Sequence, residues 1–137
     1  MKSLSILIPI YNEEESLQAL FEELKFSFEN NQSIEIIFIN DGSSDMSQKV
    51  IENEIANHST WKLINLYRNY GKSVALQSGI DIASNELIAT LDGDLQDPPE
   101  LIESFYKKWN EGYEVVYGSR VEREASFFMN FAYKTFY

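Results

Sequence analysis

Residues 4–40 read LSILIPIYNEEESLQALFEELKFSFENNQSIEIIFIN, and this stretch decides the fold class. Its two apolar runs, residues 4–10 and 35–40, are typical of β-strands that are covered on both faces. Between them, residues 13–30 place large apolar side chains at three- and four-residue steps, which predicts an amphipathic helix. Three glutamates begin that helix and suit its positive end. The stretch therefore predicts a strand, a helix and a second strand.

The rest of the chain repeats this alternation. Further strands are predicted over residues 61–67, 86–91 and 114–117. Further helices are predicted up to about Asn57, over residues 73–83, and from Pro98 to the glycine at position 112. Such alternation with short connections predicts an α/β fold, a doubly wound, mostly parallel sheet with helices on both faces.

Composition limits what the chain can do. Its 137 residues amount to about one domain, and 44% hydrophobic residues suffice for one core. Eleven basic against 22 acidic residues give a formal net charge of −11, which repels phosphate backbones, so we expect no nucleic-acid partner. Zero cysteines exclude disulfides and thiolate chemistry and are compatible with the cytoplasm. No 18 apolar residues run together, so the sequence predicts no membrane span.

Polar clusters follow four of the predicted strands. They are Tyr11-Asn12-Glu13, Asp41-Gly42-Ser43, residues 68–72 (RNYGK) and residues 92–96 (DGDLQ). Ligands of open parallel sheets bind beyond the carboxyl ends of the strands, where loops and helix N-termini converge. Each cluster alone could serve as a helix cap, but four carboxylate-rich clusters on one edge predict a binding site.

The cluster at residues 92–94 (DGD) is the most informative of the four. Two carboxylates at positions i and i+2, joined by a glycine that permits a tight turn, can converge on one hard cation. The side-chain oxygen of Gln96 is within reach of the same cation. Helix capping is the alternative, but Asp97 followed by proline already predicts a capped helix start. We therefore predict that Asp92 and Asp94 contact a metal ion or a nucleotide.

Other polar residues keep alternative interpretations. Asp41 is either a turn or cap residue or a carboxylate that accepts hydrogen bonds from a base or ribose. Lys72 either contacts a phosphate or pairs with a surface carboxylate. Gly71 is expected to serve loop geometry. His58, the only histidine, is expected to be a solvated loop residue, so histidine-based acid–base catalysis gains no support.

Five motifs together resemble a known family. They read SILIPIYNEEESL, INDGSSD, RNYGKSVALQSGI, LDGDLQDPPELI and VVYGSR, in this order over nearly the whole chain. This set resembles the family 2 glycosyltransferases of the GT-A fold. The form DGDLQDPPE most resembles the polyprenyl-phosphate branch of that family.

The resemblance implies a nucleotide-sugar donor, a UDP- or GDP-sugar, at the strand ends. Pro9, Tyr11, Glu13 and Asp41 would surround the base and ribose. Together with the loop residues, the predicted donor-binding set is Pro9, Tyr11, Glu13, Asp41, Gly71, Lys72 and Asp92. A Mg²⁺ or Mn²⁺ ion on Asp92, Asp94 and Gln96 would grip the diphosphate and stabilise the departing nucleotide. The implied activity is an inverting, metal-dependent sugar transfer.

The implied acceptor is a polyprenyl-type lipid phosphate, which is already anionic and requires no general base. By similarity Arg120 would face that phosphate and act with Asp94 in catalysis, with Arg123 a weaker candidate; a surface ion pair is the alternative for Arg120. A sugar hydroxyl is the alternative acceptor and would need a base beyond Tyr137. A non-catalytic nucleotide-binding module is a further alternative. A phosphatase-like hydrolase is disfavoured, because leucine and glutamine follow the second aspartate.

The family pattern continues past the GSR motif, so we expect a truncated chain. Residues 1–120 would form the donor-binding core and residues 121–137 the start of an acceptor-side region. Independent catalysis by the 137 residues alone is doubtful. That last segment carries many aromatic residues. They are expected to pack on further chain, to lie on the inner face of a membrane or to join a homo-oligomer.

Overall fold

The structure is a computed structural model, and it describes residues 3–28, 31 and 33–118. Arg120, Arg123 and the aromatic segment 125–137 lie outside the described residues, so their predicted roles stay predictions. Four strands alternate with four helices in the described part. The elements are β1 (Leu4–Ile10), α1 (Leu17–Phe28), β2 (Ile34–Asn40), α2 (Ser47–Ile55), β3 (Trp61–Asn65), α3 (Lys72–Ile82), β4 (Leu87–Thr90) and α4 (Leu101–Asn110).

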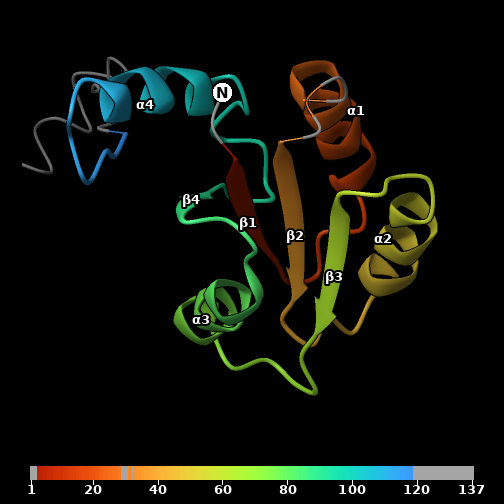
Figure 1. Cartoon of the computed structure of the whole chain (residues 1–137). Helices are drawn as coiled ribbons and strands as arrows, with labels where there is room; N and C mark the ends of the chain where they lie inside the picture. The colour runs from red at the N-terminus through yellow and green to blue at the C-terminus, as the bar shows by residue number, and fades with distance from the viewer. Residues whose placement is uncertain (1–2, 29–30, 32, 119–137) are drawn as a thin grey trace, which may run out of the picture.

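The strands form one parallel sheet in the order β3-β2-β1-β4. The chain builds outward from β1 to β3 and then crosses back to place β4 on the other side of β1. In Figure 1 the arrowheads of β2 and β3 point downward, so the carboxyl ends of these strands lie at the bottom of the view. The order reverses between β1 and β4, and parallel sheets bind ligands outside the carboxyl ends at such a reversal.

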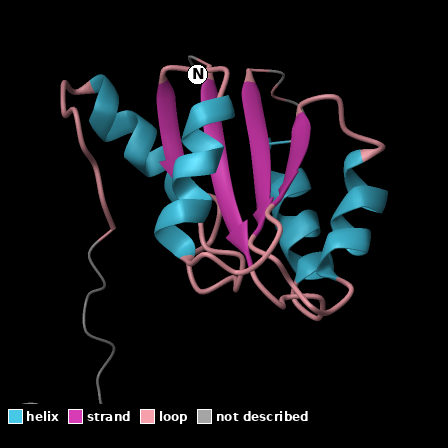
Figure 2. Cartoon of the chain, turned by 90° about the horizontal axis from the view of Figure 1, so that it is seen from below, coloured by secondary structure: helices cyan, strands magenta, loops and turns pink. Residues whose placement is uncertain are grey.

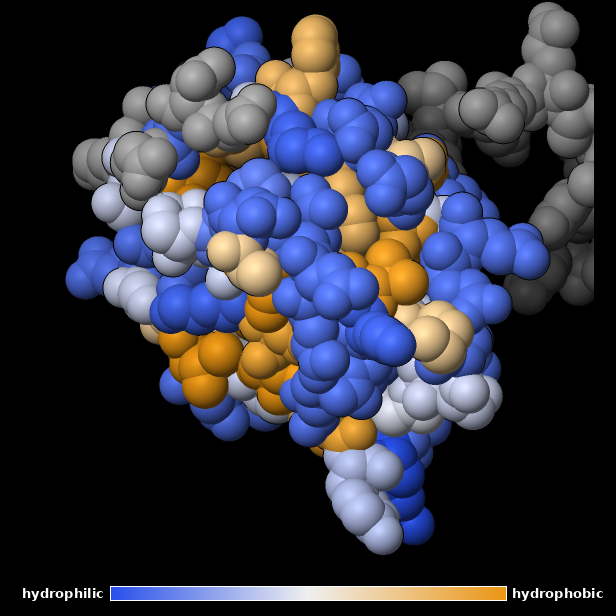
Figure 3. All heavy atoms as spheres, turned by 90° about the vertical axis from the view of Figure 1, so that its right-hand side faces the viewer, coloured by the Kyte–Doolittle hydropathy of each residue, from blue (hydrophilic) through white to orange (hydrophobic). Residues whose placement is uncertain are grey.

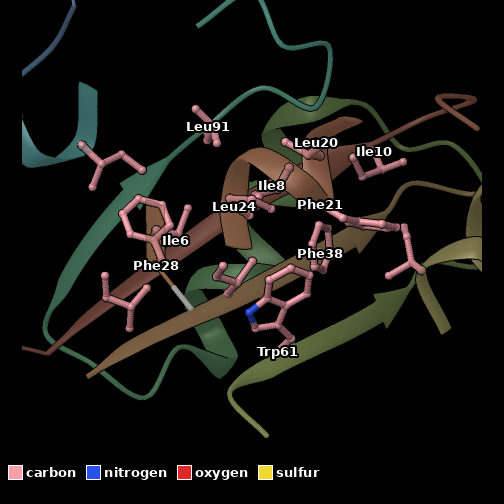
Figure 4. Close-up of a cluster of buried hydrophobic side chains, with 14 of the residues drawn as sticks. Ile6, Ile8, Ile10, Leu20, Phe21, Leu24, Phe28, Phe38, Trp61 and Leu91 are labelled. Atoms are coloured by element: carbon pink, nitrogen blue, oxygen red, sulfur yellow. The ribbon is translucent and has the colours of Figure 1, made fainter. Parts of the chain in front are cut away.

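Helices cover both faces of the sheet, as Figure 2 shows and as the sequence predicted. On one face, α1 and α2 bury a cluster that includes the rings of Phe21, Phe38 and Trp61 (Figure 4). The Phe21 and Phe38 rings meet edge to face, with centroids 5.7 Å apart. On the other face, α3 packs Ala75 against side chains from the centre of the sheet. The doubly wound α/β prediction is confirmed.

β1 and β2 are the most deeply buried strands, because both lie in the middle of the sheet under helices. Their continuous apolar runs reflect this double cover. The surface that carries α2 and β3 is mainly hydrophilic, with hydrophobic side chains only in scattered groups (Figure 3). No helix within the described residues is long and apolar enough to cross a bilayer.

The prediction of a fifth strand at residues 114–117 is wrong. Among the described residues β4 is the last strand, and it hydrogen-bonds only to β1. Val115 and Tyr117 are 78% and 81% exposed. Favourable β-propensity does not form a strand without a neighbour to pair with, because propensity mainly reflects packing on a sheet.

The predicted start of α4 also needs correction. The helix begins at Leu101, and Glu100 rather than Asp97 holds the cap position, without a side-chain cap bond. The amides of Leu101 and Ile102, the first two residues of the helix, donate hydrogen bonds to the carbonyls of Pro98 and Pro99 at 3.0 and 3.1 Å. A residue that precedes proline is disfavoured in the helical region, so the double proline delays the helix.

His58 is not the solvated loop residue that the sequence predicts. Its ring stacks on Trp61 with centroids 4.0 Å apart, and its side chain is only 16% exposed. Glu54 lies 3.3 Å from its Nε2 atom. The stacked ring closes one end of the core, which gives this histidine a structural role.

Candidate active site

The four polar clusters meet at the carboxyl edge of the sheet, as predicted. The loop after β1 is hydrogen-bonded to the loop after β2, and Asp41 at the end of β2 is hydrogen-bonded to the loop before α3. Lys72 at the start of α3 forms an ion pair with Asp92 after β4. A longer contact of 3.4 Å between Ser16 Oγ and the Gly93 carbonyl returns to the first loop. The strand-end loops therefore form a closed ring of contacts, which we call the loop ring.

The turn at residues 92–94 packs closely against the end of β1. A Cβ atom on Gly93 would lie 2.4 Å from Ile10 Cδ1, so a larger residue here would require the Ile10 side chain to shift. Asp94 is exposed, and its Oδ1 accepts a hydrogen bond from the Gln96 amide at 3.1 Å. Leu95 between them has a positive φ of 61°. This local turn places Asp92, Asp94 and the exposed Gln96 together at the carboxyl edge of the sheet.

Asp92 is paired with a cation. Its Oδ1 lies 2.5 Å from Lys72 Nζ, and the two side chains are 38% and 58% exposed. The sequence allowed two roles for Lys72, a contact with a phosphate or an ion pair with a surface carboxylate. The structure shows the carboxylate contact, and the partner is itself a predicted site residue.

Asp41 is 4% exposed, and both of its oxygens accept hydrogen bonds from backbone amides. Oδ1 accepts from Tyr70 at 2.8 Å and Oδ2 from Gly71 at 2.9 Å. Beside it, Gly42 has φ 68°, and a Cβ there would lie 2.3 Å from the carbonyl carbon of Arg68. Gly71 has φ 92°, which agrees with its predicted role in loop geometry. These contacts fix the loop that carries Lys72.

Asn12 is a residue whose importance the sequence analysis did not show. Its backbone has φ 54°, and its side-chain oxygen accepts from the Ser44 amide at 2.8 Å, while its own amide donates to Ser43 Oγ at 3.0 Å. Asp45 accepts from the Glu14 amide at 3.1 Å. Although burial raises the pKa of Asp45, hydrogen bonds from Ser47 and Glu14 outweigh it, so the pKa lies below its ordinary value. An asparagine two residues after the end of a strand is the one signal that the sequence offered for this contact.

The remaining predicted donor residues lie along the same edge. Pro9 is partly buried near the end of β1, and Tyr11 just beyond it is 48% exposed. Glu13 accepts a hydrogen bond from Ser16 Oγ at 3.0 Å, and its amide donates to Ser47 Oγ at 3.0 Å. Glu13 is thus held within the loop ring, whereas the Tyr11 ring is accessible to a ligand.

A hollow of about 820 Å³ opens beside the ion pair, between β4, α4 and residues 114–118. Lys72, Asp92 and Asp97 line it together with apolar side chains such as Phe105 and Trp109. Ligand pockets commonly combine such a volume with apolar walls and a few polar groups. The hollow therefore adjoins the predicted donor site.

The oxygen-bearing side chains at residues 92–96 suit a metal cation that is also held by the phosphates of a bound substrate. No group of three or more histidine, cysteine or acidic side chains suited to a metal ion occurs in the part of the chain that the structure describes. Mg²⁺ is usually held by one or two carboxylates plus substrate phosphates, not by an all-protein cage. Two aspartates and one amide oxygen match that arrangement, and the Lys72 ammonium already contacts one of the aspartates.

Comparison with known proteins decides the family. The chain matches the family model described as glycosyl transferase family 2 over residues 5–135. The chain belongs to glycosyltransferase family 2. The resemblance drawn from the five motifs is therefore confirmed.

Curated relatives and solved structures agree with this assignment. The chain is 43% identical over 98% of its length to an uncharacterized glycosyltransferase of Synechocystis, of which it covers 43%. It is 41% identical over 98% of its length to an undecaprenyl-phosphate 4-deoxy-4-formamido-L-arabinose transferase of Photorhabdus laumondii, of which it covers 42%. The chain thus spans less than half the length of these relatives.

Two solved structures share the fold. Staphylococcus aureus TarS in complex with UDP-GlcNAc has a TM-score of 0.70 at 21% identity, over 90% of this chain and 37% of TarS. The mannosyltransferase of Pyrobaculum calidifontis in complex with GDP-Man and Mn²⁺ has a TM-score of 0.68 at 18% identity, over 76% of this chain and 31% of that protein. At these identities the likeness establishes the GT-A fold of this chain and leaves its donor open.

Proposed function

We propose that this protein transfers a sugar from a nucleotide diphosphate donor to a polyprenyl-type lipid phosphate. The observation that carries the donor part is the loop ring, which gathers four strand-end loops at the reversal point of the sheet. The undecaprenyl-phosphate sugar transferase that shares 41% of the sequence supports the lipid-phosphate acceptor. An acceptor of this kind would place the enzyme at the cytoplasmic face of a membrane.

The donor would lie across the loop ring. Its base and ribose would contact the edge formed by Pro9, Tyr11, Glu13 and Asp41, where Tyr11 offers an accessible ring. Its diphosphate would lie near Lys72 at the N-terminus of α3, where backbone amides and the helix dipole favour anions. The structural neighbours contain a UDP-sugar in one case and a GDP-sugar in the other, so both donors belong in the test.

Asp92, Asp94 and Gln96 would hold a Mg²⁺ or Mn²⁺ ion. When bound, such a cation stabilises the negative charge on the departing nucleoside diphosphate. The chain's own contribution is to pack the turn at residues 92–94 closely against the Ile10 side chain at the end of β1. The acceptor phosphate is already anionic, so no protein base is required, and Arg120 is proposed to orient it.

Calorimetric titration tests the donor and the metal. We expect UDP-glucose, UDP-GlcNAc or GDP-mannose to bind in the presence of Mn²⁺ and to lose at least about tenfold in affinity with EDTA or in Asp94→Ala. Asp81→Ala removes an exposed aspartate from the far end of α3 and should bind the donor like the wild type. Equal donor affinity in Asp94→Ala and wild type would contradict the metal assignment.

A transfer assay tests the acceptor. Radiolabelled donor and undecaprenyl phosphate should yield a chloroform-soluble sugar lipid, made by the protein or by a longer chain that contains it. Labelled sugar released into water, with none in the lipid, would contradict the lipid-phosphate acceptor.

A further inference from the structure

Lys72 breaks a local rule of helix design. It is the first residue of α3, where the helix dipole favours negative charge, and the first turn of α3 contains no acidic side chain. A lysine there does not stabilise the helix. Positions that break a local rule often serve function, so its contacts need an explanation.

The surrounding backbone holds this lysine in reach of Asp92. Asp41 accepts hydrogen bonds from the amides of Tyr70 and Gly71, the two residues before Lys72. The amide of Ala75 donates to the Gly71 carbonyl at 3.1 Å and starts the helix directly behind the loop. The backbone of Lys72 is therefore fixed, while its side chain is 58% exposed and retains rotational freedom.

The contact itself is easily exchanged. Among residues 3–28, 31 and 33–118, which the structure describes, Lys72 is the sole hydrogen-bond or ion-pair partner of the Asp92 carboxylate. Ion pairs this exposed contribute little to stability, because water solvates both charges well. A stronger cation can therefore take the carboxylate at small cost.

We propose that Lys72 and the divalent cation compete for Asp92, and that cation binding transfers the Lys72 ammonium to the diphosphate of the donor. This inference rests on the proposed function and adds the order in which Lys72 makes its contacts. The two interpretations of Lys72 from the sequence, a carboxylate partner and a phosphate contact, then describe two successive contacts of one side chain. Lys72 is a positioning residue for Asp92 and a binding residue for the donor.

Charge explains the transfer. A dication at Asp92 repels an ammonium group a few ångströms away, and this repulsion is felt most strongly where water is partly excluded. The diphosphate brings at least two negative charges to the same edge, next to the N-terminus of α3. When the Lys72 ammonium moves from Asp92 to the diphosphate, it escapes the repulsion of the dication and gains the attraction of the diphosphate.

Metal titrations with Lys72→Gln test the competition. Bare Mn²⁺ in the millimolar range, followed by the electron paramagnetic resonance signal of the uncomplexed ion, should bind Lys72→Gln about two- to fivefold more tightly than wild type. UDP or GDP titrated in saturating Mn²⁺ should bind Lys72→Gln several-fold more weakly. A lysine with a merely structural role would not move these two affinities in opposite directions.

Two controls sharpen this test. Lys108→Gln removes the same charge from a pair of similar exposure, Lys108–Glu111, and should leave both affinities unchanged. In an Asp92→Asn background, the Lys72→Gln change should no longer tighten Mn²⁺ binding, because both effects run through the same carboxylate. Unfolding midpoints of all variants show that the fold is retained.

The outcomes separate the two proposals. Unchanged or weaker Mn²⁺ binding by Lys72→Gln, in a protein that binds Mn²⁺ and nucleotide, overturns the competition and leaves the proposed function intact. No binding of Mn²⁺ or nucleotide by the wild type overturns the proposed function and the competition with it.

Discussion

Two lysine–carboxylate pairs lie at opposite ends of the same sheet. At the amino end, Lys62 pairs with Glu35, whose side chain is 9% exposed. At the carboxyl end, Lys72 pairs with Asp92, whose side chain is 38% exposed. The residue types are nearly the same, yet their surroundings differ in burial and in the number of partners.

Glu35 is held by several donors besides Lys62. It accepts hydrogen bonds from Ser5 Oγ at 2.6 Å and from the amide and hydroxyl of Ser84 at 2.9 and 2.8 Å. Burial raises the pKa of Glu35, but the hydrogen bonds from Lys62, Ser5 and Ser84 outweigh it and lower the pKa from 4.5 to about 2. A carboxylate fixed in this way ties β1, β2 and the loop before β4 together. Asp92, with one exposed partner, is instead ready to exchange.

The amino-end pair should make the free energy of unfolding depend strongly on pH. Because the folded-state pKa of Glu35 lies below its unfolded value, its stabilisation is complete above about pH 4.5 and is lost as pH falls toward 2. Glu35→Gln should therefore be less stable than wild type by about 3 kcal/mol at pH 7, and the difference should shrink toward pH 2. Urea unfolding at pH 7, 5, 4 and 3 measures it.

A matched variant controls this experiment. Glu111→Gln removes an exposed carboxylate paired with Lys108, and its unfolding curve should follow wild type at each pH. If Glu35→Gln and wild type differed by the same amount from pH 7 to pH 3, the amino-end pair would not be the structural tie described above.

The second prediction concerns two glycines of the carboxyl edge. Both have positive φ, but only Gly42 meets neighbouring backbone, at 2.3 Å from Arg68, whereas nothing lies within 4 Å of a Cβ on Gly71. Gly71→Ala should cost about 1.5 kcal/mol through backbone strain alone, because its φ of 92° with ψ of 157° is a conformation that almost only glycine adopts. Gly42→Ala should cost about 2.5 kcal/mol, because the loop before α3 must also move. Urea unfolding measures both costs. Equal costs would show that the loop before α3 moves aside with no loss of stability.

The fold was largely predictable from the sequence because the central strands are covered on both faces. The apolar runs of β1 and β2 mark them to within one residue. The strand predicted at residues 114–117 was wrong because pairing depends on a neighbour and not on the segment itself. The start of α4 was misplaced because Pro98 was interpreted as the first helical residue, although Pro99 directly after it disfavours the helical conformation at Pro98.

The candidate site was predictable as a location and not as a set of contacts. Parallel strands bring their carboxyl ends to one edge, so the clusters at residues 41–43 and 92–94 could be placed together from the sequence. The pairing of Lys72 with Asp92 could not, because it joins residues 20 positions apart through the return of β4 to the side of β1. The contact between Asn12 and Ser44 depends on a left-handed backbone that no residue count reveals.

Substitutions of Asn12 test how firmly the first two loops of the carboxyl edge are joined. Asn12→Gly keeps the positive φ without strain and deletes the oxygen that accepts from the Ser44 amide. One such bond contributes about 1 kcal/mol or less, so the Ser44 amide should exchange with deuterium up to about fivefold faster, while global unfolding changes little. Asn12→Ala adds backbone strain and should lose more. If hydrogen exchange at Ser44 were as slow in Asn12→Gly as in wild type, the loop after β2 would keep its structure without the loop after β1. The carboxyl edge would then be held as firmly as the amino end around Glu35.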